Sequence, residues 1–301
     1  MVSIFQRTNF DPETIERLGK LADRARAVDG RDPFADDLWH RATAGQTRLA
    51  LSADDDGELA GAAFVADQGE RRAAELLVDP ERRGQGHGGE LLAELLRRVD
   101  GELWLWSHGD HPAARTLARR HGLHRARELL QLRRDASVPV PAIEPPPGVT
   151  VRTFEPGHDE NAWLRVNAAA FASHPEQGSR TLEDLHQAEA EPWFDPAGFF
   201  LAVDASGELL GFHWTKIHPP ASGEPGGTRV GEVYVLGVAP HAHGQGVGSY
   251  LTAAGLRYLA SQPGVEELML YVEGDNAAAR RVYERLGFTQ YGIDVAYHRA
   301  G

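Results

Sequence analysis

Cysteine is absent from this chain of 301 residues. Its absence excludes a disulfide framework, a thiolate metal site and a cysteine nucleophile. No apolar stretch reaches the roughly 18 residues that a membrane-spanning helix needs. Residues 1–7 also lack the basic start and long apolar core of a signal peptide. These absences predict a cytoplasmic protein without a membrane partner.

Basic residues are outnumbered, with 31 Lys and Arg against 44 Asp and Glu, and the formal net charge is -13. Nucleic acid and anionic membranes both favour a basic face, so neither is expected as the main partner. An anionic cofactor stays possible, because a local nest of backbone amides can bind phosphate inside an acidic protein. The length and the ordinary share of hydrophobic residues, 42%, suit two globular domains.

Residues 135–148 read DASVPVPAIEPPPG, which is rich in proline and poor in periodic apolar residues. Proline fixes φ and removes a backbone donor, so the segment is expected to be an extended, semi-rigid linker. A long surface loop within one domain is the alternative. The linker interpretation predicts an N-terminal domain over residues 1–134 and a C-terminal domain over residues 149–301.

The two halves repeat. VDPERRGQGHGG begins at Val78 and VAPHAHGQGVGS begins at Val238, with valine, proline and the glycines of the turn in register. About thirty residues later, DHPAAR begins at Asp110 and DNAAAR begins at Asp275. Matched features at matched separation indicate one fold used twice.

The second half has the clearer periodicity. Strands are expected over residues 149–154, 199–204, 209–217, 229–238, 267–272 and 288–298. Helices are expected over residues 159–171, 181–189, 246–260 and 276–286. This order predicts an α/β domain with a mixed sheet (α+β in the arrangement of its strands), present twice.

In each half a strand leads into a glycine-rich turn and then a helix. Glycine takes positive φ and allows close approach to the backbone, and the free amides of a helix start bind anions. The turn is therefore a candidate pyrophosphate site. Tight helix–strand packing also explains glycines. A Rossmann site is disfavoured because the preceding strands look like antiparallel hairpins.

The turn resembles the hallmark of the GCN5-related N-acetyltransferases (GNAT), Gln/Arg-x-x-Gly-x-Gly/Ala. Arg83 opens a full match, whereas His243 replaces Gln or Arg in the second copy. Asn276 to Phe288 resembles the family's second block, N-x-x-A-x-x-x-Y-x-x-x-G-F. The resemblance implies two tandem GNAT domains that bind acetyl-CoA, without a metal. It implies these cofactor-binding residues: Leu76, Leu77, Val78, Gly84, Gln85, Gly86, His87, Gly88, Gly89, Leu236, Gly237, Val238, His243, Gly244, Gln245, Gly246, Val247, Gly248, Ser249, Asn276, Ala277, Ala278, Ala279, Arg280 and Arg281.

Acetyl transfer to an amine requires a base for the ammonium, a donor for the oxyanion and an acid for the thiolate. Glu232, on the strand before the turn, is the candidate base, directly or through water, if burial raises its pKa. Tyr283 stands where the superfamily often has the acid. A solvated strand carboxylate and a core aromatic are the respective alternatives.

Aligning the halves places Arg72 opposite Glu232, His111 opposite Asn276 and Ala118 opposite Tyr283. The first half thus keeps the glycine turn but lacks the base and the acid. We expect it to bind acetyl-CoA without turnover.

Segments around Gln177, Trp214, Glu232 and Tyr271 resemble the mycothiol synthase family of actinobacteria. That family acetylates the cysteinyl amine of a cysteine–glucosamine–inositol conjugate, the last step of mycothiol biosynthesis. The resemblance implies the following acceptor-binding residues: Asp36, Glu176, Lys216, Glu232 and Tyr271.

Alternatives stay open for several of these residues. Glu176 also fits a helix cap, and Lys216 a surface lysine. His213 and His218 suggest a metal, but no third ligand is evident, and surface histidines are the preferred interpretation. We expect a monomer. The chain also fits a tandem acetyltransferase for another amine, an aminoglycoside or a protein N-terminus, or a non-catalytic acetyl-CoA sensor.

Overall fold

The computed structural model describes residues 3–7, 10–68, 71–172, 175–220 and 227–299, without the side chains of residues 68, 175 and 176. The chain divides into two compact units. Unit 1 comprises Met1–Leu129 and Gly292–Gly301, and unit 2 comprises Leu130–Tyr291. No helix among the described residues is long and apolar enough to cross a membrane.

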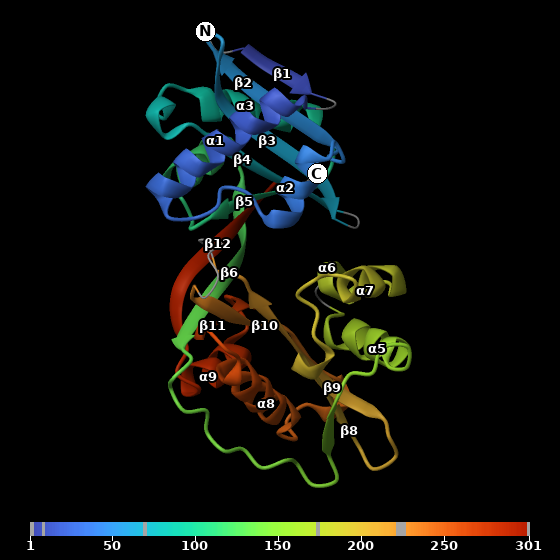
Figure 1. Ribbon diagram of the computed structural model, residues 1–301. Coiled ribbons are helices and arrows are strands. Elements are labelled where there is room, and N and C mark those ends of the chain that lie inside the picture. Colours follow the sequence, from blue (N-terminus) through green and yellow to red (C-terminus); the bar gives the residue numbers. More distant parts are fainter. Residues whose placement is uncertain (1–2, 8–9, 69–70, 173–174, 221–226, 300–301) are drawn as a thin grey trace. The chain divides into compact units, whose positions relative to one another are not determined.

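Unit 1 contains a mixed sheet whose strands follow the order β1-β2-β3-β4-β5-β12 (Figure 1). Its strands are β1 (Ser3–Arg7), β2 (Leu49–Asp55), β3 (Glu58–Gln68), β4 (Arg71–Val78), β5 (Leu103–His108) and the end of β12 (Thr289–Arg299), with the first part of β6 (His124–Asp135). Its helices are α1 (Pro12–Asp29), α2 (Asp36–Thr43), the 3₁₀ turn η1 (Pro80–Arg82), α3 (His87–Arg98) and α4 (Pro112–Arg120).

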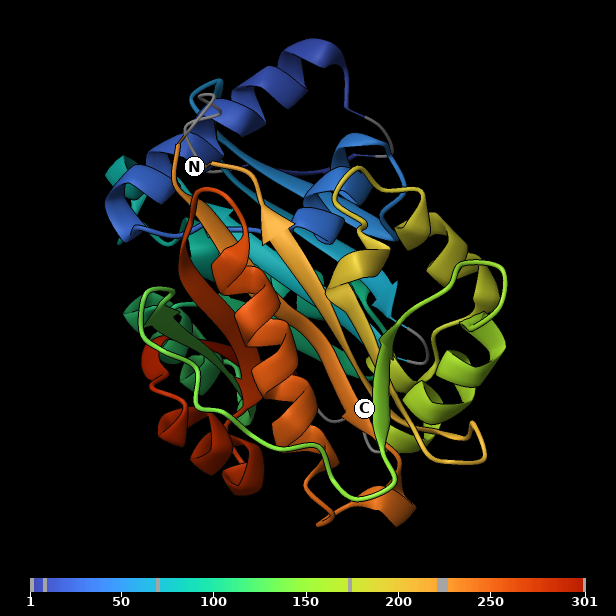
Figure 2. The ribbon, with the colours of Figure 1, turned by 60° about the horizontal axis from the view of Figure 1, so that its bottom comes forward.

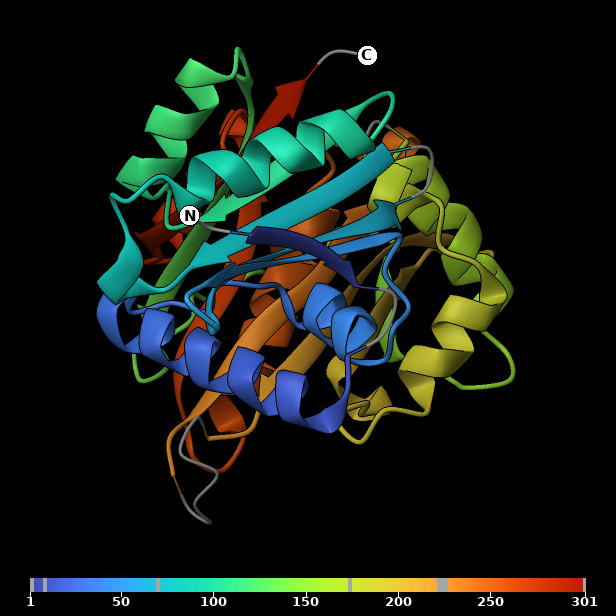
Figure 3. The same cartoon turned by 90° about the horizontal axis from the view of Figure 1, so that it is seen from above.

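Helices cover both faces of the unit 1 sheet, as Figure 3 shows for α3 on one face and α1 and α2 on the other. Alternate residues of a strand point to opposite faces of the sheet. Because helices cover both faces of this sheet, the strand residues on both faces are apolar. The α3 face buries Leu91, Leu92 and Leu95 against β2, β3 and β5. The opposite face buries Leu18 and Phe64 with other residues of α1, α2 and β3.

Unit 2 repeats this plan with strands in the order β6-β11-β10-β9-β8-β7. Its strands are the end of β6, β7 (Thr150–Thr153), β8 (Phe199–Val203), β9 (Leu209–His218), β10 (Arg229–Val238) and β11 (Val265–Glu273). Its helices are α5 (Glu160–Ala170), α6 (Pro175–Gly178), α7 (Leu182–Glu189), η2 (Pro196–Gly198), η3 (Pro240–Ala242), α8 (Val247–Ser261) and α9 (Ala277–Arg285).

The unit 2 sheet also has a core on each face. Figure 2 shows α8 lying along one face of β10, where Val247 and Leu251 pack with residues of β8 and β9. On the other face, Trp163 of α5 packs with Phe212 and Trp214 of β9. Every strand and helix predicted for the second half is present within a few residues of its predicted bounds, which confirms the predicted mixed α/β fold.

The compact units and the predicted domain boundaries differ at their ends. The last strand pairs with β5, from Asp294 opposite His108 to Arg299 opposite Leu103, and so residues 292–301 belong to unit 1. The end of β6 belongs instead to unit 2, where Arg133 forms an ion pair with Glu267 at 2.5 Å.

The proline-rich segment after β6 forms neither helix nor strand until β7. It lies against unit 2, because the Ala136 N–H donates to Glu266 O (2.9 Å) and Arg257 Nη1 donates to Pro141 O (3.3 Å). Hydrogen bonds at Ala136 and Pro141 thus join the first half of the segment to unit 2.

Candidate active site

Strand β10 separates from β11 partway along its length. The parallel ladder joins Arg229 to Val233 of β10 with β11 and ends at the Val233–Leu270 pair. The antiparallel ladder with β9 continues to Val238, with a β-bulge between Val233 and Val235. Among the described residues, the last part of β10 is thus hydrogen-bonded on its β9 side, and its other edge is open to an extended ligand.

The glycine turn after β10 has the backbone that an anion site needs. Gly244 and Gly246 have φ of 76° and 86°, a region that favours glycine. Gly246 is the N-cap of α8, and in the described part of the chain no side chain caps the first amides of this helix. Val247, Gly248 and Ser249 form the first turn, and the Gln245 side chain donates to His241 O at 2.8 Å. The first copy has the same geometry, with φ of 77° at Gly84 and 100° at Gly86.

His243 takes over a contact that an arginine makes in the first copy. Arg83 Nε donates to Val78 O at 3.3 Å, and His243 Nε2 lies 2.9 Å from Val238 O. A carbonyl oxygen only accepts, so Nε2 of His243 carries the proton. The departure from the family pattern therefore preserves the contact that ties the turn to its strand.

The second matched block forms the same helix in both halves. Asn276 Oδ1 accepts from the Ala279 N–H (3.0 Å) and caps α9, the helix of Ala277 to Arg285 that includes the predicted cofactor-binding residues Ala278, Arg280 and Arg281. His111 Nδ1 accepts from the Ala113 N–H (3.1 Å) and caps α4. The alignment of His111 with Asn276 is thereby consistent with the structure.

Tyr283 is buried on α9, 8% exposed, with its ring 5.9 Å from that of Phe288. Burial raises the pKa of Tyr283 to about 12, so the phenol keeps its proton at neutral pH. The N–H of Phe288 donates to Tyr283 O, and the N–H of Leu123 donates to Ala118 O in the same way. Ala118 therefore occupies the position of Tyr283 in unit 1 and offers no proton.

Glu232 is a buried carboxylate, 8% exposed, on the face of β10 that looks toward α5 to α7. Its Oε2 lies 2.7 Å from His218 Nε2. Glu232 is paired with Lys216 on β9 and with Met269 on β11, and paired residues point to the same face of a sheet. The alternative of a solvated strand carboxylate is wrong.

Predicted acceptor-binding residues gather on this face. Lys216 Nζ lies 4.6 Å from the ring centroid of Trp193 and 5.4 Å from that of Tyr234. Tyr271, 41% exposed, stands two residues beyond Met269 and accepts a hydrogen bond from Gln131 Nε2 at 2.7 Å. The structure thus brings Lys216, Glu232 and Tyr271 to one face, with an aromatic wall that the sequence did not single out.

The two other predicted acceptor residues lie on different elements. Glu176 lies in α6, and its side chain is outside the described residues. Asp36 lies exposed in the first turn of α2, in unit 1.

The preferred interpretation of the β9 histidines as surface residues is wrong for His213. The ring is fully buried, and Nδ1 lies 2.8 Å from Leu251 O. Burial lowers the pKa of His213 to about 4, so the ring stays neutral under ordinary conditions. The His213 ring packs directly against Gly255 of α8, where any side chain would overlap the ring. A single-sequence pattern does not reveal this pairing of a large residue with a glycine.

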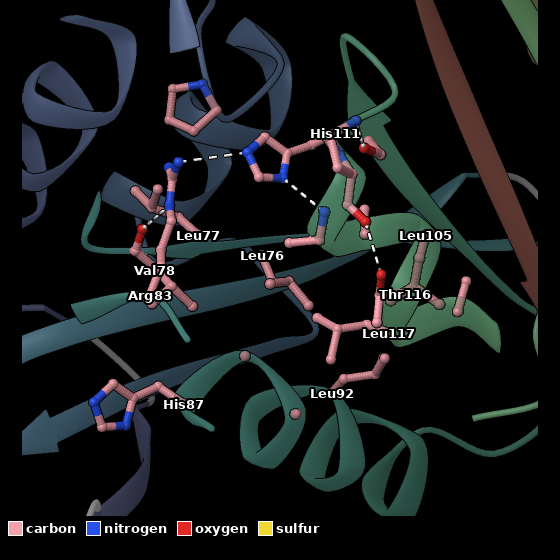
Figure 4. A pocket seen from close by; sticks show the side chains of 18 of the residues that line it. Leu76, Leu77, Val78, Arg83, His87, Leu92, Leu105, His111, Thr116 and Leu117 are labelled. Carbon is pink, nitrogen blue, oxygen red and sulfur yellow. Dashed lines mark hydrogen bonds between the residues drawn. The ribbon is translucent and has the colours of Figure 1, made fainter. Parts of the chain in front are cut away.

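A cavity of about 560 Å³ lies in unit 1 beside the first glycine turn. Figure 4 shows Leu76, Leu77 and Val78 along one side of it, with Arg83 hydrogen-bonded to His111. The predicted cofactor-binding residues that line it are Leu76, Leu77, Val78, Gly84, Gly86, His87, Gly88 and Gly89. Gln85 is not among its lining residues.

Charged groups near this cavity already have partners. Arg83 forms two hydrogen bonds of 2.7 Å with Asp29 and holds the pKa of that carboxyl below its usual range. Glu75, buried on β4, accepts from the Ala35 N–H at 2.8 Å and lies 3.2 Å from His108. Burial lowers the pKa of a histidine, but the hydrogen bonds to Asp294 and Glu75 outweigh it and raise the pKa of His108 to about 10. His108 therefore carries a proton at neutral pH and does not act as a base.

The predicted alignment of Arg72 with Glu232 is wrong by one residue. In unit 1, Ala73 pairs with Ala66 on β3 and Trp104 on β5. Glu232 has the corresponding two partners on β9 and β11, because the bulge at Tyr234 adds one residue to β10. Alanine thus stands at the position of the candidate base in unit 1.

The model of the acetyltransferase (GNAT) family matches the chain over residues 15–123 and 163–288. The chain therefore belongs to the acetyltransferase (GNAT) family, as a tandem of two such domains. The mycothiol acetyltransferase of Geodermatophilus obscurus is 50% identical over 299 residues, 96% of this chain and 96% of the relative. That of Acidothermus cellulolyticus is 47% identical over 304 residues, 96% of this chain and 92% of the relative. Within the family, the chain groups with the mycothiol acetyltransferases, which confirms the predicted resemblance.

A solved structure described as a tandem GNAT protein from the clavulanic acid biosynthesis pathway has the same fold. It is 20% identical, with a TM-score of 0.70, and the match covers 99% of this chain and 98% of that chain. At this identity the likeness concerns the fold alone.

Proposed function

We propose that the protein transfers the acetyl group of acetyl-CoA to the cysteinyl amine of a cysteine–glucosamine–inositol conjugate, giving mycothiol. The names of relatives that are about half identical over nearly the whole chain support the acceptor. The observation that supports the chemistry is the position of the buried Glu232 on β10. Just beyond it, β10 is no longer paired with β11, and the strand then leads into the glycine turn.

Acetyl-CoA fits unit 2 on the geometry of its backbone. The amides of the turn at Gly244 to Gly248 and the positive end of α8 suit a pyrophosphate. The open edge of β10 at Leu236, Gly237 and Val238 suits the amide-containing pantetheine arm and the thioester carbonyl. Oriented backbone N–H groups there would stabilise the oxyanion that forms when the amine attacks.

Two side chains would assist the reaction, one at the nitrogen of the acceptor and one at the sulfur of the coenzyme. Glu232 takes the proton of the acceptor ammonium, directly or through a water, which frees the nitrogen lone pair for attack. Tyr283 keeps its proton at neutral pH and donates a hydrogen bond to the sulfur as the carbon–sulfur bond breaks. Lys216, Tyr271 and Glu176 are the proposed contacts to the hydroxyl-rich acceptor, and the reaction needs no metal.

Unit 1 is proposed to bind acetyl-CoA without turning it over. Its glycine turn and cavity match the coenzyme, whereas alanines replace the base and the acid, and the nearby His108 is protonated. On this view unit 1 is the non-catalytic part and unit 2 the catalytic part of a monomeric enzyme.

An acetylation assay with purified protein tests the proposal. We expect the conjugate to gain one acetyl group on nitrogen while its thiol still reacts with a thiol reagent. Transfer to an aminoglycoside or a peptide N-terminus, with none to the conjugate, would identify a different acceptor. Acetyl-CoA binding without transfer to any amine would indicate a sensor.

A further inference from the structure

The neighbourhood of Glu232 contains a histidine to which the proposed function gives no role. His218 ends β9, and its Nε2 lies 2.7 Å from Glu232 Oε2. The contact is short and joins a donor to a carboxylate, the kind of hydrogen bond that is stronger than a neutral one.

The register of the sheet produces this contact. Glu232 pairs with Lys216, and Val230 pairs with His218, so His218 is a diagonal neighbour of Glu232 on the same face. Diagonal neighbours are within reach of long and aromatic side chains. The bulge at Tyr234 lies on the far side of Glu232 and leaves this part of the ladder regular.

Other charged groups facing Glu232 have different partners. The ammonium of Lys216 lies over the rings of Trp193 and Tyr234. On β11, Glu267 forms an ion pair with Arg133, and Tyr271 accepts from Gln131. From the loop before α7, Arg180 donates to the hydroxyl of Tyr234.

The side chains of Glu232 and His218 differ in their exposure to solvent. The side chain of Glu232 is 10% exposed, and that of His218 is 31% exposed. The carboxylate is thus the more buried member of the pair, and the imidazole is the more accessible one.

We propose that His218 is a positioning residue for Glu232, an inference that rests on the proposed function of Glu232 as the base. The Nε2–H of His218 holds Oε2 and leaves Oε1 for the acceptor. In the proton-transfer step an N–H bond of the ammonium breaks, the proton bonds to Oε1, and the electron pair stays on nitrogen. His218 keeps its own proton throughout.

A double-mutant cycle tests the proposal. The four proteins are the wild type, His218→Phe, Glu232→Gln and the double variant, assayed at alkaline pH where part of the amine is already free. We expect His218→Phe to lower kcat about tenfold in the wild-type background, with an unchanged KM for acetyl-CoA, and to have no further effect beside Glu232→Gln. An equal loss in both backgrounds would show a general structural role and overturn the proposal.

A conservative variant guards against misfolding. His218→Gln keeps a side-chain N–H donor and should recover most of the lost kcat. If His218→Phe does not fold, His218→Ala with added imidazole provides the same comparison, and failure of imidazole to restore kcat counts against the proposal. His158→Gln, an exposed histidine ahead of α5, is the matched control.

A spectroscopic measurement separates this inference from the proposed function. In protein labelled with ¹⁵N-histidine, the Nε2 proton of His218 should give a downfield signal that moves upfield in Glu232→Gln, where the acceptor is neutral, and is lost in His218→Gln. Its absence from the wild type would overturn the inference even if the conjugate is acetylated. Its presence in a protein that does not acetylate the conjugate would leave the pair in place and refute the acceptor instead.

Discussion

At the scale of single residues, the site places a buried carboxylate beside a histidine and a lysine. Glu232 faces His218 on one side, while Lys216 is drawn onto Trp193 and Tyr234. A lysine ammonium this close to two aromatic faces is attracted by the electrons of the rings. In the part of the chain that the structure describes, the hydrogen bond of His218 goes to Oε2 of the carboxylate, and no side chain is seen to hold Oε1.

Glu232→Gln is expected to lower kcat for acetyl transfer by about 10² to 10⁴, the usual contribution of a positioned base. Glutamine keeps the shape and an acceptor oxygen, so the dissociation constant for acetyl-CoA should not change. Steady-state kinetics and titration calorimetry measure the two quantities. Glu266→Gln, an exposed residue near the start of β11, is the control, and full activity of Glu232→Gln would eliminate Glu232 as the base.

At the scale of elements, the glycine turns and the helix formed by the second block could be predicted from the sequence. Gly84 and Gly244 have the positive φ that their motif requires, and Asn276 caps the helix that its position indicated. These features are local, because a turn or a cap depends on a few neighbouring residues.

Features that depend on pairing between distant strands could not be predicted. Because of the bulge at Tyr234, the residue of unit 1 that is equivalent to Glu232 is Ala73 and not Arg72. Neither half of the chain has an unusual residue at this point that would reveal the bulge. The burial of His213 depends on Gly255 in α8, and the contact of His218 depends on register. Strand register follows from the packed sheet rather than from local sequence.

The two turns also provide a comparison within one chain. Gly246→Ala places a β-carbon at φ of 86° and Gly86→Ala at φ of 100°, so each strains its own turn. We expect Gly246→Ala to raise KM for acetyl-CoA about tenfold or more and to lower kcat/KM. Gly86→Ala should weaken binding at the first site and leave kcat/KM nearly unchanged. Calorimetry and kinetics on both variants test this, and a matching loss of turnover in Gly86→Ala would place chemistry in unit 1.

At the scale of the whole molecule, the C-terminal strand is part of unit 1. Asp294 accepts from the Gly109 N–H at 3.0 Å and lies 3.4 Å from His108 Nδ1. His108 also faces the buried Glu75. A charged cluster built from three strands therefore fastens the end of the chain to the first half.

This cluster predicts a dependence of stability on pH. The pKa of His108, about 10, is above that of an unfolded histidine, so its stabilisation is complete below pH about 6.5 and is lost as the pH rises through 10. Asp294→Asn should lower the free energy of unfolding by about 3 kcal/mol at neutral pH and flatten its decline toward pH 10. Denaturant melts of both proteins across this range provide the measurement. A decline of equal steepness in the variant would refute this role of the cluster.

A crystal structure with acetyl-CoA and the cysteine–glucosamine–inositol conjugate would test the central claim most directly. We predict the pyrophosphate on the amides of Gly244 to Gly248, the thioester along Leu236 to Val238, and the cysteinyl nitrogen within hydrogen-bond reach of Glu232 or of a water held by it. A structure with that turn empty while the first turn is filled, or with Glu232 directed away from the thioester, would contradict it.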